Sequence, residues 1–286
     1  MTPPTTTVNK PPQDLARQIA NRLVEARRQA RALSGYPGIP PQSLEDAYAI
    51  QDIAIELWEE RIGGWKVARV PPDLEDRFES DRLAGPIFAS TIHEVTTGST
   101  IEVPIFGGGF AALELEFVVV IGEDPPADHW SWTPDEAREM IADLRIGIGL
   151  AGSPLATINE LGPAVVVSDF GNSFGLVVGP TIHNWQTRPL ETLRCSARID
   201  GHEVGEGGAY TLSGGFIRSV QFLLELAARR GLPLHAGDMI ATGETTGVHS
   251  IAVGQTGIAD FGDDGQLGIT AVAATPKTTH QDNSLA

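Results

Sequence analysis

The run from Phe110 to Ile121 sets two acids into an otherwise apolar stretch, and this pattern constrains the fold more than any other in the chain. Because successive side chains of a strand point to opposite faces, Glu114 and Glu116 would share one face while Leu115 points to the other. Two carboxylates in one small space repel each other unless a proton or a cation lies between them. Oxygen ligands suit hard cations such as Mg²⁺ or Mn²⁺. The pattern therefore indicates a metal site, with a solvated strand face as the alternative.

Charge and cysteine content exclude several classes of function. The 286-residue chain has a formal net charge of −17, which disfavours binding to nucleic acid or to an anionic membrane, since both require a basic surface. Cys195 is the only cysteine, so no intrachain disulfide is possible. The first residues do not resemble a signal peptide, and no apolar run reaches the length of about 18 residues that a membrane span requires. We therefore expect a cytoplasmic protein in a reducing compartment.

The chain divides into four predicted parts. Residues 1–12 and 275–286 are polar and are predicted to be disordered tails. Residues 13–63 carry apolar side chains at helical spacing and are predicted to form a helical segment. Residues 64–274 are rich in short apolar runs separated by glycines and are predicted to form a β-rich domain that carries the site.

Apolar periodicity predicts the individual helices. The first is expected over 13–34 and the second over 44–62, where Ser43 is the N-cap residue. Two further helices are expected over 133–144 and 213–230, and strands over 164–168 and 174–179.

Lys66 is a candidate for proton transfer. It lies between Trp65 and Val67, where a charged ammonium would be partly removed from water. Such a lysine either extends its charged end to solvent or is held near an acid as a proton-transfer group with a lowered pKa. The sequence does not decide between these two interpretations.

Two polar turns are candidates for substrate binding. Asp169 and Asn172 lie in a turn between apolar segments, where they either line a pocket or serve as ordinary turn residues. Thr242 and Gly243, with Thr245 close behind, bring hydroxyl and backbone N–H groups together. That combination is a plausible seat for a carboxylate, although a glycine-rich loop without a ligand fits equally well.

Five segments in this order resemble the 2-keto-4-pentenoate hydratase and 4-oxalocrotonate decarboxylase family, which belongs to the fumarylacetoacetate hydrolase superfamily. The resemblance extends over about residues 13–273, nearly the whole chain. The segments are Gly64-Trp65-Lys66-Val67-Ala68, Glu114-Leu115-Glu116-Phe117, Gly152-Ser153-Pro154-Leu155, Ser168-Asp169-Phe170-Gly171-Asn172 and His235-Ala236-Gly237-Asp238-Met239-Ile240-Ala241-Thr242-Gly243.

The resemblance implies an α+β fold, a rolled mixed β-sandwich with an N-terminal helical layer. It also implies a divalent metal, usually Mg²⁺ or Mn²⁺, a small 2-oxo or 2-hydroxydienoic acid as substrate, a role in aromatic catabolism, and a homo-oligomer. Glu114 and Glu116 match the metal ligands of the family, and Lys66 matches its active-site lysine. Thr242 and Gly243 fall in the segment that holds the substrate carboxylate.

One position departs from the family pattern. The family usually has a third acidic ligand at the position that aligns with Gly149, and neither Ile148 nor Leu150 can replace it. Mg²⁺ often binds through one or two carboxylates with water and substrate, so a weaker site is still expected. The predicted activity is the addition of water to a 2-hydroxy-2,4-dienoate. The alternatives are decarboxylation of 4-oxalocrotonate, an isomerase or lyase of a specialised pathway, and a protein that has kept the fold but lost the metal.

Overall fold

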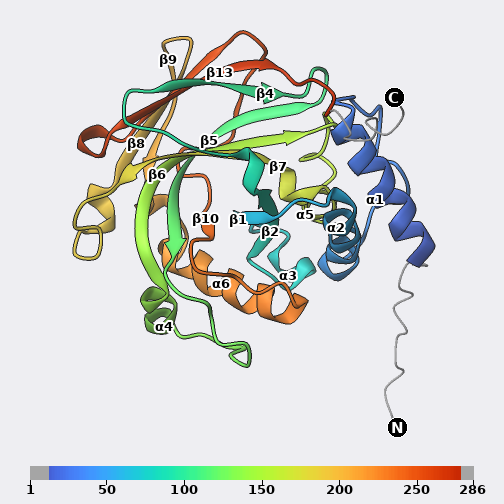
Figure 1. The fold of residues 1–286 in the computed structure, drawn as a ribbon, viewed down its shortest axis with the longest axis horizontal. Helices are drawn as coiled ribbons and strands as arrows, with labels where there is room; N and C mark the ends of the chain where they lie inside the picture. The colour runs from blue at the N-terminus through green and yellow to red at the C-terminus, as the bar shows by residue number, and fades with distance from the viewer. Residues whose placement is uncertain (1–12, 278–286) are drawn as a thin grey trace, which may run out of the picture.

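The computed structural model describes residues 13–277, so the predicted tail 1–12 and most of the predicted tail 275–286 lie outside the described residues. Two curved sheets, one of eight strands and one of five, make up most of the described chain. Helices α1, α2 and α5 gather at one side of these sheets (Figure 1). The predicted α+β architecture, a rolled mixed β-sandwich with an N-terminal helical layer, is confirmed.

The larger sheet carries the two acids and has the order β2-β1-β10-β5-β6-β7-β3, with β11 also paired to β5. It is mixed, because β1 runs parallel to β10 and β3 parallel to β7, while the other pairs are antiparallel. Its strands are β1 (Ile62–Arg69), β2 (Arg82–Phe88), β3 (Ile92–Glu94), β5 (Phe110–Ile121), β6 (Ile141–Ser153), β7 (Ser173–Thr181), β10 (Met239–Ala241) and β11 (His249–Ser250).

The smaller sheet has the order β4-β13-β12-β8-β9. Strands β8 and β9 form a hairpin at Asp200 and Gly201, whose φ values of 49° and 80° are those that an Asp-Gly turn favours. The strands are β4 (Thr100–Ile105), β8 (Arg194–Ile199), β9 (His202–Gly208), β12 (Thr256–Asp260) and β13 (Gln266–Ala273).

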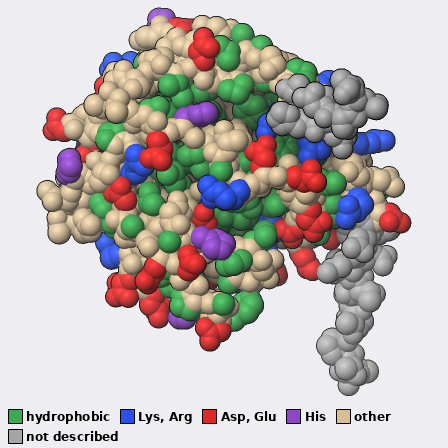
Figure 2. Space-filling model, viewed as in Figure 1, with side chains coloured by type: hydrophobic (Ala, Val, Ile, Leu, Met, Phe, Trp, Pro, Cys, Tyr) green, Lys and Arg blue, Asp and Glu red, His purple; other side chains and the backbone are tan. Residues whose placement is uncertain are grey.

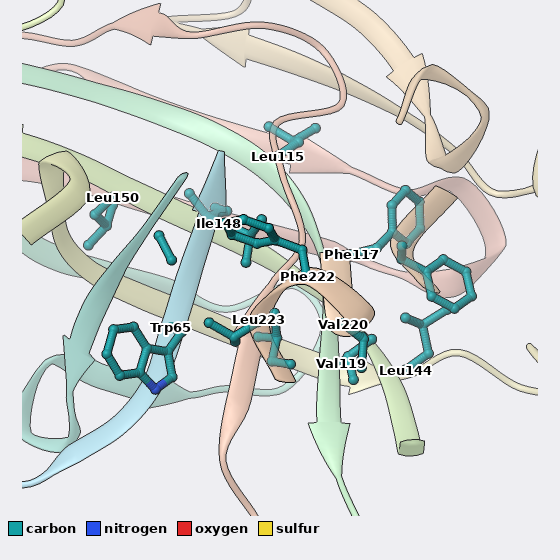
Figure 3. Close-up of a cluster of buried hydrophobic side chains, with 14 of the residues drawn as sticks. Trp65, Leu115, Phe117, Val119, Leu144, Ile148, Leu150, Val220, Phe222 and Leu223 are labelled. Carbon is teal, nitrogen blue, oxygen red and sulfur yellow. The ribbon is translucent and has the colours of Figure 1, made fainter. Parts of the chain in front are cut away.

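The main core lies against one face of β5. Leu115 and Phe117 of this strand are fully buried and belong to the same apolar cluster as Ile148 of β6 (Figure 3). Helix α6 (Gly215–Arg230) adds Val220, Leu223 and other side chains to that cluster (Figure 3). Burial of this face directs the alternate residues of β5, Glu114 and Glu116 among them, to its other face.

The N-terminal helices are shorter than their apolar patterns predict. Helix α1 (Gln13–Arg28) ends before Ala30, which has a φ of 48°. Helix α2 (Leu44–Trp58) begins at the predicted N-cap, where the Asp46 N–H donates to Ser43 Oγ at 3.1 Å. It ends at Glu59, whose φ is 61°, and β1 follows from Ile62. A short helix, α3 (Glu75–Phe78), lies between β1 and β2.

One predicted helix is too long and one predicted strand is wrong. Helix α4 (Pro134–Glu139) is only six residues long, because the apolar residues from Ile141 onward pair with β5 as strand β6. Residues 164–168, predicted as a strand, lie in helix α5 (Pro163–Ser168). A short apolar run fits a buried helix as well as a buried strand, and the proline at the first helical position was the signal that favoured the helix.

The surface reflects the acidic composition. Carboxylates are spread over the face shown in Figure 2 and gather along its lower edge, while basic side chains lie singly or in small groups. Within residues 13–277, no helix is both long and apolar enough to cross a membrane.

We predict that Leu115→Ala lowers the free energy of unfolding by about 2–5 kcal/mol, because it leaves a cavity in the core behind the two acids. Chemical denaturation would measure the change. Val253→Ala, at a position that is 52% exposed, is the control and should change stability by less than about 0.5 kcal/mol. A loss of less than about 1 kcal/mol for Leu115→Ala would show that this face is not tightly packed.

Candidate active site

The pairing of β5 with β6 determines what faces the two acids. Glu114 lies opposite Gly149 and Glu116 opposite Gly147. Both carboxylates are buried, with 3% and 0% of the residue exposed. A β-carbon added to Gly149 would lie 3.3 Å from Glu116 Oε1 and 3.6 Å from Glu114 Oε2. Position 149 therefore lies directly beside both acids, and even a β-carbon there would press on the Glu116 side chain.

Lys66 approaches Glu114 from strand β1. Its Nζ forms an ion pair with Glu114 Oε2, and the lysine is itself buried, with 5% exposed. Burial disfavours the ammonium, but attraction to Glu114, and further to Glu116 and Glu244, outweighs burial and raises the pKa of Lys66 above its ordinary value. Of the two interpretations that the sequence left open, Lys66 is the one held near an acid, but its pKa is raised and not lowered. The raised pKa favours the charged form of Lys66.

One carboxylate oxygen of Glu116 accepts a hydrogen bond, and the other has no partner among the described residues. The Gly243 N–H donates to Glu116 Oε2 at 2.7 Å. Within the described residues, buried Glu116 Oε1 has no hydrogen-bond partner. Burial and the neighbouring Glu114 carboxylate raise the pKa of Glu116 well above its ordinary value. A carboxyl group in this position holds a proton unless a cation neutralises it.

A cavity of about 400 Å³ opens beside the Lys66–Glu114 pair. Polar and charged side chains, including Arg69, Asn172 and Glu244, line it together with the pair. Its apolar lining includes Leu74, Leu83, Pro163, Val166 and Val248. A larger surface cavity of about 730 Å³ near α4 and α6 contains neither Lys66 nor Glu114. We place the site at the smaller cavity because the buried ion pair lies there.

Asn172, which lies in the predicted polar turn that also contains Asp169, lines this cavity. Its Nδ2 donates to Asn159 Oδ1 at 3.3 Å, and its own Oδ1 has no partner among the described residues. The turn packs closely on β2 at Gly85, where a β-carbon would lie 2.0 Å from the Phe170 carbonyl oxygen. Glycine at position 85 is thus required for the turn to place Asn172 at the cavity.

Thr242 and Gly243 contact β5. Thr242 Oγ1 donates to the Phe117 carbonyl at 2.7 Å, and the Gly243 N–H binds Glu116 as described above. Their polar groups are thus engaged with the strand that carries the acids. Neither residue is among those that line the cavity.

Asp169 lies in a different buried network. Arg27 Nε of α1 is 2.5 Å from Asp169 Oδ1, and Ser153 Oγ donates to Asp169 Oδ2 at 2.5 Å. Arg27 also donates to the carbonyl oxygens of Gly152 and Ser173. This network ties the first helix to the ends of β6 and β7, and the Asp169 carboxylate is not part of the cavity lining.

Four polar or charged cavity residues were not predicted from the sequence: Arg69, Asn159, Glu160 and Glu244. Glu244 follows directly after Gly243, Arg69 lies three residues after Lys66, and Asn159 lies in the chain between β6 and α5. Glu244 and Arg69 adjoin motifs that were recognised. Asn159 had no local signal, because its role depends on contact with Asn172.

A model of the fumarylacetoacetate (FAA) hydrolase C-terminal family matches residues 74–278, more than half of the chain. The chain belongs to this family. The superfamily identified from the five motifs is therefore confirmed.

Solved structures share the family fold with this chain. The 4-oxalocrotonate decarboxylase from Pseudomonas putida G7, complexed with magnesium and adipate, has a TM-score of 0.73 at 19% identity, covering 92% of this chain and 99% of that one. Fumarylpyruvate hydrolase from Pseudomonas aeruginosa, in complex with Mn²⁺ and pyruvate, has a TM-score of 0.56 at 17% identity, covering 75% and 91%. At these identities the likeness shows the fold.

We predict that Asp169→Asn lowers the free energy of unfolding by about 3–5 kcal/mol, because it leaves the buried Arg27 guanidinium without its carboxylate. Chemical denaturation would measure the loss. Glu56→Gln removes an exposed ion pair with Arg17 and should cost less than about 1 kcal/mol. If Asp169 bound substrate instead, its substitution would raise KM and leave stability unchanged.

We predict that Glu116→Gln raises Tm in buffer that contains a chelator, and more at pH 8 than at pH 5. The raised pKa of Glu116 means that the folded state binds more protons than the unfolded state, so wild-type stability falls as pH rises above about 4.3. The neutral amide of the variant does not titrate, so the variant does not lose stability in this way as pH rises. Each 1 kcal/mol gained raises Tm by roughly 2–4 °C.

Thermal unfolding followed by circular dichroism from pH 5 to pH 8 would measure the difference. The control is Glu102→Gln at an exposed position of β4, which should leave the pH dependence of Tm unaltered. Parallel curves for Glu116→Gln and wild type would show that Glu116 does not titrate with a raised pKa.

Proposed function

We propose that this chain is a divalent-metal-dependent hydratase that adds water to a 2-hydroxy-2,4-dienoate and forms a 4-hydroxy-2-oxo acid. The observation that carries this proposal is the buried Lys66–Glu114 ion pair at the cavity, next to the unpartnered oxygen of Glu116. Lys66 can donate a proton, and the carboxylates of Glu114 and Glu116 can bind a cation, at neighbouring positions that are largely shielded from solvent.

The residues present fit a hard divalent cation. Glu114 and Glu116 would hold it, because each has a carboxylate oxygen close to Gly149, and the Glu116 oxygen there is buried without a partner among the described residues. When bound, such a cation stabilises negative charge that develops on the 2-oxygen of the substrate. The structural relatives complexed with magnesium and Mn²⁺ support this choice of ion.

Lys66 is the group best placed to move the proton. In the proposed reaction the dienol loses its 2-hydroxyl proton and gains a proton at C5, which gives the 2-oxo-3-enoate. The Lys66 ammonium supplies the proton that C5 gains. The resulting amine takes up the proton that the 2-hydroxyl loses, so Lys66 regains its charge. Water then adds its oxygen at C4 while C3 takes a proton.

The walls of the cavity match such a substrate. Leu74, Leu83 and Val166 provide apolar contacts for a short carbon chain. Asn172 and Arg69 carry N–H groups that can bind a carboxylate. We therefore assign Asn172 to substrate binding, and Thr242 and Gly243 to the support of the strand that carries Glu116.

Decarboxylation of a 2-oxo-dioic acid is the second candidate. It draws on the same stabilisation of charge at the 2-oxygen, and the chain shares the fold of 4-oxalocrotonate decarboxylase over 92% of its length. Asn172 and Arg69 together offer N–H groups for both carboxylates of such a substrate. The cytoplasmic location, the homo-oligomer and the role in aromatic catabolism stay predictions.

We predict that wild-type protein with Mg²⁺ or Mn²⁺ accelerates the loss of dienol absorbance of 2-hydroxypenta-2,4-dienoate, and that Lys66→Gln slows this by about 10²–10⁴-fold. Lys66→Arg keeps the positive charge but cannot release a proton near neutral pH, so it should be similarly slow. Normal activity of Lys66→Arg would mean that only the charge of Lys66 is needed.

The wild-type assay separates the two reactions. Decay no faster than in a control without enzyme would contradict the hydratase proposal. Release of carbon dioxide from 4-oxalocrotonate, without hydration of the dienol, would identify the decarboxylase instead. Circular dichroism of the Lys66 variants is the control for folding.

A further inference from the structure

Strand β6 offers no acidic side chain beside Glu114 and Glu116, which lie opposite Gly149 and Gly147. Ile148 and Leu150, the neighbours of Gly149, are buried in the main core cluster on the other face of the sheet. Glu114 and Glu116 therefore obtain no third carboxylate from the strand that lies opposite them. Any further ligand from this chain must come from a different element.

The segment after β10 runs along the strand that carries the two acids. Thr242 Oγ1 donates to the Phe117 carbonyl at 2.7 Å, and the Gly243 N–H donates to the Glu116 carboxylate at 2.7 Å. The Thr245 N–H donates to the Leu115 carbonyl at 3.0 Å, and Thr245 Oγ1 donates to the same oxygen at 2.9 Å. Glu244 is thus held between two residues that are anchored to β5 beside the acids.

Glu244 lines the same cavity as Lys66 and Glu114. It is partly buried, and within the described residues it forms no ion pair with a basic side chain. Burial and the Glu114 carboxylate raise the pKa of Glu244 above its ordinary value. Arg69, a further cation of the cavity, is engaged by Glu75 at 3.2 Å.

The charges at this end of the cavity do not balance. Three acids, Glu114, Glu116 and Glu244, influence one buried ammonium, that of Lys66. Glu116 Oε1 is completely buried and has no partner among residues 13–277, which is a second sign that these acids bind a positively charged ligand. A divalent cation would neutralise the excess charge and use the unpartnered oxygen.

We propose that Glu244 supplies the third carboxylate of a divalent-cation site with Glu114 and Glu116, in place of an acid at position 149. This inference rests on the proposed function. The side chain of Glu244 must rotate toward Glu114, because among residues 13–277 no three acidic, histidine or cysteine side chains already form a metal site. The third carboxylate thus comes from the loop after β10 and not from β6.

Titration of the full chain with MnCl₂ alone tests the proposal, because free Mn²⁺ is counted directly by electron paramagnetic resonance and the readout does not depend on activity. We expect Glu244→Gln to weaken Mn²⁺ binding at least tenfold. Glu244→Asp keeps the charge but shortens the side chain, and it should also weaken binding severalfold if Glu244 touches the ion.

Two further variants serve as matched tests. Glu160→Gln removes a different carboxylate from the same cavity, at an exposed position, and should change Mn²⁺ affinity less than about twofold. Gly149→Glu in the Glu244→Gln background places an acid beside both glutamates, with a small shift of the Glu116 side chain, and should restore binding. The thermal unfolding curve of each variant verifies that it is folded.

The outcomes separate this inference from the proposed function. If wild type binds Mn²⁺ and Glu244→Gln binds it equally well, Glu244 is not a ligand, while the metal-dependent hydratase proposal stands. If Glu244→Gln and Glu160→Gln weaken binding equally, or if Glu244→Asp binds like wild type, Glu244 acts only through its charge and the inference is overturned. If wild type binds no Mn²⁺, the metal site and the function that depends on it both fail.

Discussion

The rest of the site depends on the burial of two like charges on one strand. Glu114 and Glu116 lie on the face of β5 that points away from the main core, and the apolar residues that alternate with them, Leu113, Leu115 and Phe117, hold the strand in that register. Their mutual repulsion in a dry environment must be offset by positive charge. Lys66 provides part of it, through an ion pair formed across the sheet from β1.

The surrounding elements position these charges. Strand β10 lies between β1 and β5, and the loop after it donates the Gly243 N–H to Glu116. The Arg27–Asp169 pair fastens the first helix to the far ends of β6 and β7. Gly85 lets the turn that carries Asn172 approach β2 closely. The site is therefore assembled from segments that are far apart in the sequence and are joined by buried polar contacts.

Two predictions of secondary structure failed because short apolar runs fit both a buried helix and a buried strand. The apolar run at 164–168 was predicted as a strand and is helix α5, while the apolar end of the predicted helix 133–144 became part of β6. Local periodicity over five or six residues does not distinguish a buried helix from a buried strand, so packing against β5 and α2 decides between them. For Lys66, a neighbouring acid and a lowered pKa were one of two interpretations. The acid is present, and the attraction of Glu114, Glu116 and Glu244 raises the pKa instead.

The sequence by itself determined the fold family, the strand with its paired acids and the absence of a carboxylate at Gly149, because each depends on residue identity and short-range alternation. Only the tertiary structure decided which polar residues meet. It directed Asp169 to Arg27 and away from the cavity, and it brought Asn172, Arg69 and Glu244 to the cavity beside Lys66. The reason is that hydrogen bonds and ion pairs between distant segments depend on how the sheet and loops pack, and short-range sequence patterns do not specify that packing.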